Sequence, residues 1–200
     1  MNLFLSARLA DGETVLLHGG GGGVTTAAMQ IVKVLAPRTR IIVTASSGKV
    51  RRVAELGADV VIDYKAEDFA DAVLRATDKR GADVILDHIG GAYLAQNQRA
   101  LAVGGRLALI GVMGGRKAEL DLGLVLRQRQ SILGSVLRPR TVEQKAEIIR
   151  QFERAVLPHF ASGKIAPLIH ETYPLARAAD AHRTMDASSH FGKLVLEVPG

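Results

Sequence analysis

Apolar runs of strand length alternate with longer helix-like segments through most of this 200-residue chain. The runs fall at 14–18, 41–44, 60–63, 83–87, 106–111 and 131–136. Repeated alternation of strands and helices predicts parallel strands joined by helical crossovers. Each run is almost continuously apolar, which is typical of strands that are covered on both faces. We therefore expect an α/β fold with a doubly wound parallel sheet of six strands.

The segments between these runs carry apolar residues at helical spacing. Helices are expected from the glycine run to Pro37 and over 50–56, 67–77, 93–101, 122–128 and 142–160. The end of the chain departs from the alternation, because Tyr173 and Pro174 are expected to open one more helix and 193–198 to form a last strand. This final strand lies beyond the six-stranded sheet and needs a partner.

Composition excludes several classes of protein and site. The chain has no cysteine, and its six histidines lack ligand-like spacing, so we expect no metal. No run approaches the roughly 20 apolar residues that span a bilayer, and no signal peptide is recognisable, so we expect a cytoplasmic protein. The net charge of +6 would attract polyanions. However, the basic residues are dispersed and only 4% of residues are aromatic, so nucleic-acid binding is not expected.

The glycine run, HGGGGGVTTAA at 18–28, lies between the first expected strand and the first helix. Glycines there permit a tight turn and let a pyrophosphate approach backbone N–H groups at the helix N-terminus. Gly20 and Gly22 satisfy the dinucleotide fingerprint G-x-G-x-x-G, but its last position is Thr25. Thr25 either shifts the helix slightly or fits because the neighbouring alanines leave room. The alternative to a phosphate site is a merely flexible turn.

The end of the second expected strand indicates which dinucleotide would bind. A carboxylate at this point would accept from the ribose 2′-OH of NAD, and none is present. The stretch TASSGKVRR instead offers the hydroxyls of Ser46 and Ser47 and the cations Lys49, Arg51 and Arg52. These groups could bind a 2′-phosphate, which favours NADP(H). A serine helix cap followed by solvated cations is the other interpretation, and both can hold together.

Seven ordered segments carry a family pattern: LADGETVLLHGG, GGVTTAAMQ, TASSGKV, ELGADVVIDY, ADVILDHIGG, GGRLALIGVMGG and FGKLVLEV. Together they extend over essentially the whole chain and are far more specific than any one of them. With these segments the chain resembles the zinc-independent, zeta-crystallin-like quinone oxidoreductases of the medium-chain dehydrogenase/reductase superfamily. The resemblance implies a Rossmann domain that binds NADP(H).

The resemblance also implies four groups of cofactor contacts. The pyrophosphate loop comprises Gly22, Gly23 and Val24. The contacts to the 2′-phosphate and the adenosine ribose comprise Ser46, Lys49 and Tyr64. The wall beside the nicotinamide comprises Ile89, Gly90, Gly111, Val112 and Met113. The C-terminal return to the cleft comprises Phe191 and Lys193. Each residue also has a purely structural interpretation as a strand cap, a turn glycine or a core side chain.

Further expectations follow from the family pattern. Family members carry an N-terminal GroES-like catalytic domain, and this sequence starts just before the segment that follows it, so the resemblance implies that this domain is absent. The chain then divides into an NADP(H)-binding domain, 1–165, and a C-terminal segment, 166–200, left over from the return to the catalytic domain. Its strand at 193–198 would have lost its home sheet, so that it pairs elsewhere, swaps or frays. The strand from Ser131 to Val136 resembles the one through which family members dimerise, which implies a homodimer.

The implied activity is hydride transfer from NADPH to a quinone, an enone or a similar activated carbonyl, a small-molecule substrate, without a metal. His18 and His88 lie near the expected cleft, but both are better interpreted as structural histidines, so no catalytic residue is assigned. A stand-alone NADP(H)-binding module without turnover is the alternative. A methyltransferase that uses S-adenosylmethionine is disfavoured, because it would need a carboxylate near the end of the second strand and TASSGK has none. The sequence does not decide among quinones, enones and enoyl thioesters.

Overall fold

A computed structural model describes residues 1–199 and has a six-stranded, fully parallel sheet at its centre. The strand order is β3-β2-β1-β4-β5-β6. The strands are β1 (Thr14–Leu17), β2 (Arg40–Ala45), β3 (Val60–Asp63), β4 (Ala82–Asp87), β5 (Leu101–Leu109) and β6 (Ser131–Gly134). The chain winds outward from β1 in both directions, so a crevice is expected at the carboxyl ends of β1 and β4. The predicted doubly wound sheet is confirmed.

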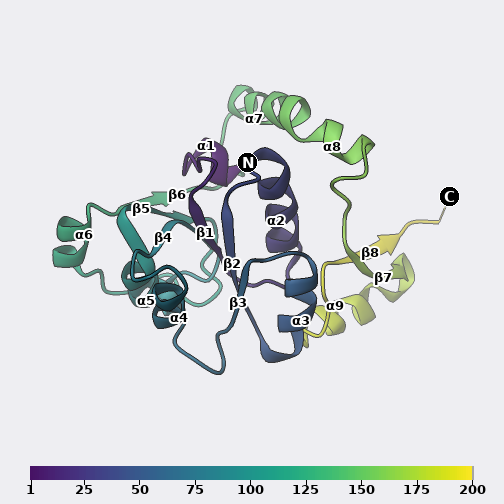
Figure 1. The fold of residues 1–200 in the computed structure, drawn as a ribbon. Coiled ribbons are helices and arrows are strands. Elements are labelled where there is room, and N and C mark those ends of the chain that lie inside the picture. Colours follow the sequence, from purple (N-terminus) through teal and green to yellow (C-terminus); the bar gives the residue numbers. More distant parts are fainter. Residues whose placement is uncertain (200) are drawn as a thin grey trace.

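Helices cover both faces of this sheet (Figure 1). One face carries α2 (Gly23–Leu35) and α3 (Val50–Glu55), and the other carries α4 (Phe69–Ala76) and α5 (Leu94–Ala100). Alternate residues of β1 pack against the two helix layers. Val15 and Leu17 belong to the apolar cluster around α2, and Leu16 belongs to the cluster around α4. All of these side chains are fully buried. The continuous apolar runs of the sequence therefore reflect burial on both faces.

Polar side chains fix where several helices begin. Asp68 accepts from the backbone N–H groups of the first turn of α4, and Asp121 does the same for α6 (Leu122–Gln128). Thr141 and Gln144 form a reciprocal capping box at the start of α7 (Val142–Ala155). Residues 1–199 also contain three short 3₁₀ turns: η1 (Ser47–Lys49), η2 (Gly91–Tyr93) and η3 (Leu175–Arg177).

The prediction of one helix over 142–160 is wrong. The chain breaks at Val156, and α8 (Leu157–Ala161) follows α7. Pro158 lies in the first turn of α8, where its missing N–H leaves no hydrogen bond unmade, whereas inside a continuous helix its ring would clash with the preceding turn. A four-residue helix that the sequence did not predict, α1 (Asn2–Leu5), packs on the core through Leu3.

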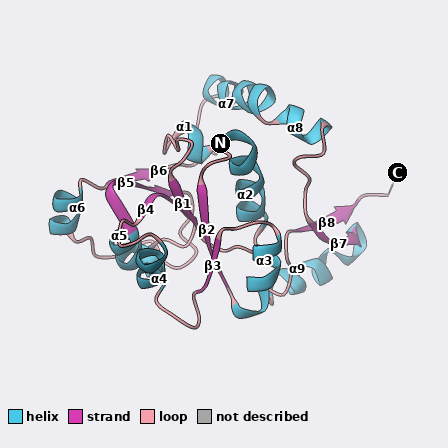
Figure 2. Ribbon diagram, viewed as in Figure 1, coloured by secondary structure: helices cyan, strands magenta, loops and turns pink. Residues whose placement is uncertain are grey.

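A second, two-stranded sheet follows these helices. Its strands β7 (Ile169–Pro174) and β8 (Lys193–Glu197) pair in parallel and are joined by η3 and α9 (Ala178–Asp186). The prediction that Tyr173 opens a helix is wrong, because this residue belongs to β7. The strand expected to lack a partner pairs with β7. We call β7, η3, α9 and β8 the C-terminal unit; Figure 2 shows it beyond α3, apart from the main sheet.

Within residues 1–199, no helix combines the length and the apolar character that crossing a bilayer requires. The domain boundary at 165/166 stays a prediction.

Candidate functional site

The glycine run forms the connection between β1 and α2. Gly19 has a left-handed backbone with φ of +67°, which glycine adopts without strain. A Cβ at Gly20 would lie 2.7 Å from the side chain of Val43 in the core, so a larger residue does not fit there. Gly22 is the N-cap residue of α2 and has an extended backbone. The glycines therefore allow a tight turn that lies close to the sheet.

The first turn of α2 presents backbone N–H groups to a ligand. Bonding within the helix begins at the Thr26 N–H, which donates to the Gly22 carbonyl at 3.0 Å. The N–H groups of Gly23, Val24 and Thr25 precede it, and amides in the first turn of a helix have no intrahelical acceptor. This turn contains no acidic residue. An anion at this end would meet free amides and the positive end of the helix dipole.

Thr25, at the last position of the fingerprint, is buried against the end of β1. Its hydroxyl donates to the backbone carbonyl of His18 at 2.5 Å. The side chain therefore joins the first turn of α2 to the strand at the position where the fingerprint has glycine. Of the two outcomes that we expected for Thr25, the structure is consistent with the one in which the residue fits.

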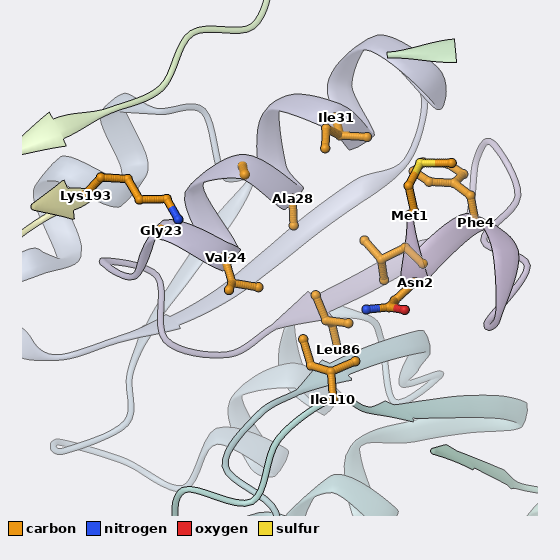
Figure 3. A pocket seen from close by; sticks show the side chains of 12 residues that line it. Met1, Asn2, Phe4, Gly23, Val24, Ala28, Ile31, Leu86, Ile110 and Lys193 are labelled. Atoms are coloured by element: carbon orange, nitrogen blue, oxygen red, sulfur yellow. The ribbon is translucent and has the colours of Figure 1, made fainter. Parts of the chain in front are cut away.

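Two lysine side chains flank the glycine loop. A Cβ built on Gly21 would run into the Lys49 side chain, and one built on Gly23 would lie 2.8 Å from Lys193 Cε. Figure 3 shows the Lys193 ammonium group beside Gly23. Burial, together with the neighbouring Arg52, lowers the pKa of Lys49. An anion held by the loop would therefore have one cation from η1 and another from β8 close to it.

The residues predicted to contact the 2′-phosphate and the ribose lie at the ends of β2 and β3. Ser46 precedes η1, and Lys49 ends η1. Tyr64 follows β3 and is 38% exposed, and its ring lies edge-on to Tyr93 with 6.3 Å between centroids. The sheet thus brings these two strand ends together, with Tyr64 open to a ligand.

Asp63 is a neighbour of this region that the sequence analysis missed. It lies opposite Ala45, the last residue of β2. A hydrogen bond from the Ser47 hydroxyl is the main cause that lowers the pKa of Asp63, so the group is a charged carboxylate at neutral pH. A negative charge beside Ser47 disfavours a phosphate on that serine. The sequence did contain a signal for it, because Asp63 ends the expected third strand, which in this fold lies beside the second strand.

The segments after β4 and β5 form one wall at the carboxyl edge of the sheet. Gly114 N–H donates to the Ile89 carbonyl at 2.6 Å. Gly90 has φ of +82°, and an added Cβ there would lie 2.9 Å from the Gly115 carbonyl; one on Gly111 would lie 2.9 Å from the His88 carbonyl. Only glycine allows these backbones to approach so closely. The structure therefore brings together the residues predicted from both segments.

Val112 and Met113 are the exposed members of this wall. Met113 is 82% exposed, so its side chain is not part of the core. The interpretation of Met113 as a core residue, which was its structural alternative, does not hold.

The C-terminal return reaches the glycine loop through its backbone. Gly192 N–H donates to the Gly21 carbonyl at 2.9 Å, next to a bridge between Gly22 and Gly192. Phe191 is buried, and the Arg52 guanidinium lies 4.1 Å from the centroid of its ring. Phe191 thus anchors the C-terminal unit on α3, whereas Lys193 faces the loop.

An apolar cavity of about 290 Å³ opens beside the N-terminus of α2 (Figure 3). Val24, Ala28 and Ile31 line it from α2, Phe4 from α1, and Met1 from the residue that precedes α1. The ends of β4 and β5 contribute further apolar side chains, and Lys193 lies at its margin. The anion-binding end of α2 therefore adjoins space for an apolar group.

His18 is buried, and both of its ring nitrogens have hydrogen-bond partners, which is what a structural histidine requires. His88 is half-buried, and burial lowers its pKa. Neither histidine is assigned an acid or base role.

Residues 56–196 match the family model of the zinc-binding dehydrogenases. The donor set here does not fit a zinc site. The sequence has no cysteine, and residues 1–199 contain no cluster of three or more histidine or carboxylate side chains that could hold a metal ion. We therefore derive no chemistry through zinc.

Curated relatives have similar sequences over nearly the whole chain. One of them, a phenolphthiocerol/phthiocerol polyketide synthase protein of Mycobacterium tuberculosis, is 35% identical over 193 residues, which are 96% of this chain and 9% of that protein. The quinone oxidoreductase of Rattus norvegicus is 31% identical over 196 residues, 97% of this chain and 57% of that protein. The solved structure of the CurK enoyl reductase superposes with a TM-score of 0.81 and 30% identity, covering 99% of this chain and 59% of that one.

The chain thus spans little more than half the length of the quinone oxidoreductase and a small part of the polyketide synthase that it matches. The parallel sheet and the glycine loop are shared features of an oxidoreductase domain that binds NAD(P). The chain belongs to the zinc-binding dehydrogenase family and is a quinone-oxidoreductase-like cofactor-binding domain of the medium-chain dehydrogenase/reductase superfamily.

Proposed function

We propose that this chain is the NADP(H)-binding part of a zinc-independent, quinone-reductase-like oxidoreductase. The observation that carries the proposal is the glycine loop, whose free amides at the start of α2 lie between Lys49 and Lys193. Amides, helix dipole and cations together favour a pyrophosphate.

When bound, NADPH supplies a hydride, and the residues of this chain hold and orient it. The loop from Gly22 to Val24 fixes the pyrophosphate, and Ser46, Lys49 and Tyr64 bind the 2′-phosphate and the ribose. Beside the nicotinamide, the wall of Ile89, Gly90, Gly111, Val112 and Met113 restricts the approach of water and of substrate. Phe191 holds the C-terminal return, from which Lys193 reaches the loop.

The substrate class that we propose is a quinone or an activated carbonyl. The rat relative is named a quinone oxidoreductase, which supports the quinone. The CurK protein is named an enoyl reductase, which supports an enoyl thioester as a second candidate. A module that binds NADP(H) without turnover is the alternative to both.

Lys49 offers a sharp test of the choice of cofactor. Lys49→Gln should weaken NADPH binding about tenfold, because one charge-assisted hydrogen bond to the 2′-phosphate is lost. It should weaken NADH binding less, because NADH has no 2′-phosphate and loses only the attraction between Lys49 and its pyrophosphate. Lys164→Gln, an exposed change in the turn after α8, is the matched control. Equal losses for NADPH and NADH would contradict the assignment of Lys49 to the 2′-phosphate.

Asp63→Asn should strengthen NADPH binding, because it removes the negative charge beside Ser47.

Turnover distinguishes the substrate candidates. NADPH oxidation should be followed with a benzoquinone and, separately, with a crotonyl thioester. Reduction of the quinone supports the proposal, and reduction of the thioester alone supports the second candidate. Tight NADPH binding without NADPH oxidation in the presence of either substrate would show that this chain on its own binds the cofactor without turnover.

A further inference from the structure

Four buried polar side chains form an unbroken hydrogen-bond series beneath the carboxyl edge of the sheet. His18 Nδ1 lies 2.9 Å from Thr44 Oγ1, and His18 Nε2 lies 2.8 Å from Asn97 Oδ1. Asn97 Nδ2 donates to Asp87 Oδ2 at 3.0 Å. None of the four residues is more than 1% exposed. They come from β2, β4 and α5 and from the residue that follows β1.

The chemistry of the groups allows one direction of donation along this series. The Asp87 carboxylate only accepts, so Asn97 must turn its amide nitrogen toward Asp87 and its oxygen toward His18. His18 Nε2 must then carry the proton and donate, which leaves Nδ1 to accept from the Thr44 hydroxyl. Burial lowers the pKa of His18 to about 4, so the ring is neutral at pH 7.

The two ends of the series, Thr44 and Asp87, accept hydrogen bonds from the two loops that we assign to the cofactor. At one end, Gly19 N–H donates to Thr44 Oγ1 at 3.4 Å, a long bond from the start of the glycine loop. At the other end, Asp87 accepts from the N–H groups of Ile89 at 2.6 Å and Gly90 at 3.1 Å. The same four side chains therefore support both loops.

Aromatic rings keep the central histidine in place. The rings of Phe69 and Tyr93 lie edge-on to His18, with centroids 4.8 and 4.9 Å away. The imidazole is therefore restricted by packing as well as by its two hydrogen bonds, so the series is rigid enough to define the separation of its ends.

We propose that His18 and Asn97 are positioning residues that set the glycine loop and the loop of Ile89 and Gly90 after β4 at the separation that a bound dinucleotide spans. The inference rests on the proposed NADP(H) function. A ligand that reaches across both loops needs this separation, whereas a ligand that occupies only the adenosine side does not. A purely structural role would affect both kinds of ligand equally.

Asn97→Asp is the decisive variant, because it keeps the size of the side chain and removes the donor to Asp87. NADPH affinity should fall about tenfold, and the affinity for adenosine 2′,5′-bisphosphate, the adenosine half of the cofactor, should change less than about twofold. Gln128→Glu on α6 makes the same amide-to-acid change away from both loops and should alter neither. Equal losses for the two ligands, or no loss for NADPH, would overturn the inference.

Exchanging the two groups provides a rescue. In Asp87→Asn/Asn97→Asp, the new asparagine can donate to the new carboxylate, which still accepts from His18 Nε2. NADPH affinity should return to within about threefold of that of the unchanged chain. A double variant no better than Asn97→Asp would count against the inference.

A measurement on the unchanged chain does not depend on whether the variants fold. Nitrogen-15 NMR of the imidazole should show His18 protonated at Nε2 and unprotonated at Nδ1 at pH 7. The opposite tautomer would overturn the inference. If the unchanged chain bound neither NADPH nor the bisphosphate, the proposed function would fail and the inference with it; unchanged NADPH affinity in Asn97→Asp would remove the inference alone.

Discussion

The six-stranded sheet and the C-terminal unit differ in how their strands are covered. All four residues of β1 are buried, whereas β7 has one buried residue, Tyr173, and β8 has none among its described residues. Apolar side chains such as Ile169 and Leu196 are exposed on the C-terminal unit. The sheet has a core on each face, but the small unit covers neither face of its two strands fully.

The candidate site therefore depends on both regions, the well-buried sheet and the more exposed C-terminal unit. The glycine loop and the wall after β4 and β5 rest on the rigid sheet. Lys193 belongs to the sparsely packed unit, which is joined to the rest by the Gly192 bond to Gly21 and by Phe191 under Arg52. Damage to the sheet should abolish the site, whereas damage to the unit should remove only Lys193.

A pair of leucine truncations gives the largest contrast. Leu16→Ala, in the sheet, should lower the free energy of unfolding by about 3 kcal/mol, because a fully buried side chain leaves a cavity. Leu196→Ala, in the C-terminal unit, should lower it by less than about 1 kcal/mol, because the side chain is 39% exposed. Urea denaturation measures both, and similar losses would show that the two regions fold as one core.

Acid should also act on the sheet through His18. The unfolded histidine takes up a proton below its ordinary pKa of 6.5, and the folded one only near 4. The unfolded state then binds more protons, so stability is lost progressively as pH falls from about 6.5 to 4, by about 3 kcal/mol at most. Nearby His88 has a pKa lowered by burial and adds in the same direction, whereas burial raises the pKa of Asp87, which opposes it.

His18→Gln removes the largest part of this pH dependence. Unfolding free energies at pH 7 and at intervals down to about pH 4.5 should fall less steeply in the variant than in the unchanged chain. Identical slopes would mean that His18 is not buried in its neutral form.

The link between the two regions is tested at Arg52. Arg52→Gln should cost about 1 kcal/mol, because the guanidinium no longer lies on the ring of Phe191, and should speed hydrogen exchange of the β8 amides. Arg51→Gln is the matched control, since Arg51 is highly exposed and pairs with Glu55 on the surface. Faster exchange in the control as well, or unchanged exchange in Arg52→Gln, would argue against this anchor.

The sheet has its own exposed edge at β6, where we predict a homodimer. Ile132→Lys places a charge on this strand and should halve the mass measured by light scattering, with little effect on the stability of the monomer fold. Ile149→Lys on α7 makes the same change on an exposed helix and should leave a dimer. A monomeric parent chain would refute the predicted dimer.

The sheet was predictable because its central strands are buried on both faces and its strand sequences read as apolar runs. The β7 strand was missed because its sequence, IHETYP, is polar and largely exposed, so it has no apolar run. The helix α1 is too short for periodicity to show. Sequence reasoning found the loops of the site through their glycines, but it could not find the Asp63 carboxylate beside Ser47 or the series from Thr44 to Asp87, which depend on which strand ends adjoin.

Calorimetric titration of the 200-residue chain with NADPH and then with NADH, in a low-phosphate buffer, tests the central claim most directly. The account predicts saturable binding of both, with NADPH at least about tenfold tighter because its 2′-phosphate meets Lys49. Absence of NADPH binding would contradict the claim that this chain is a cofactor domain, and tighter binding of NADH would contradict the assignment of Ser46, Lys49 and Tyr64 to a 2′-phosphate.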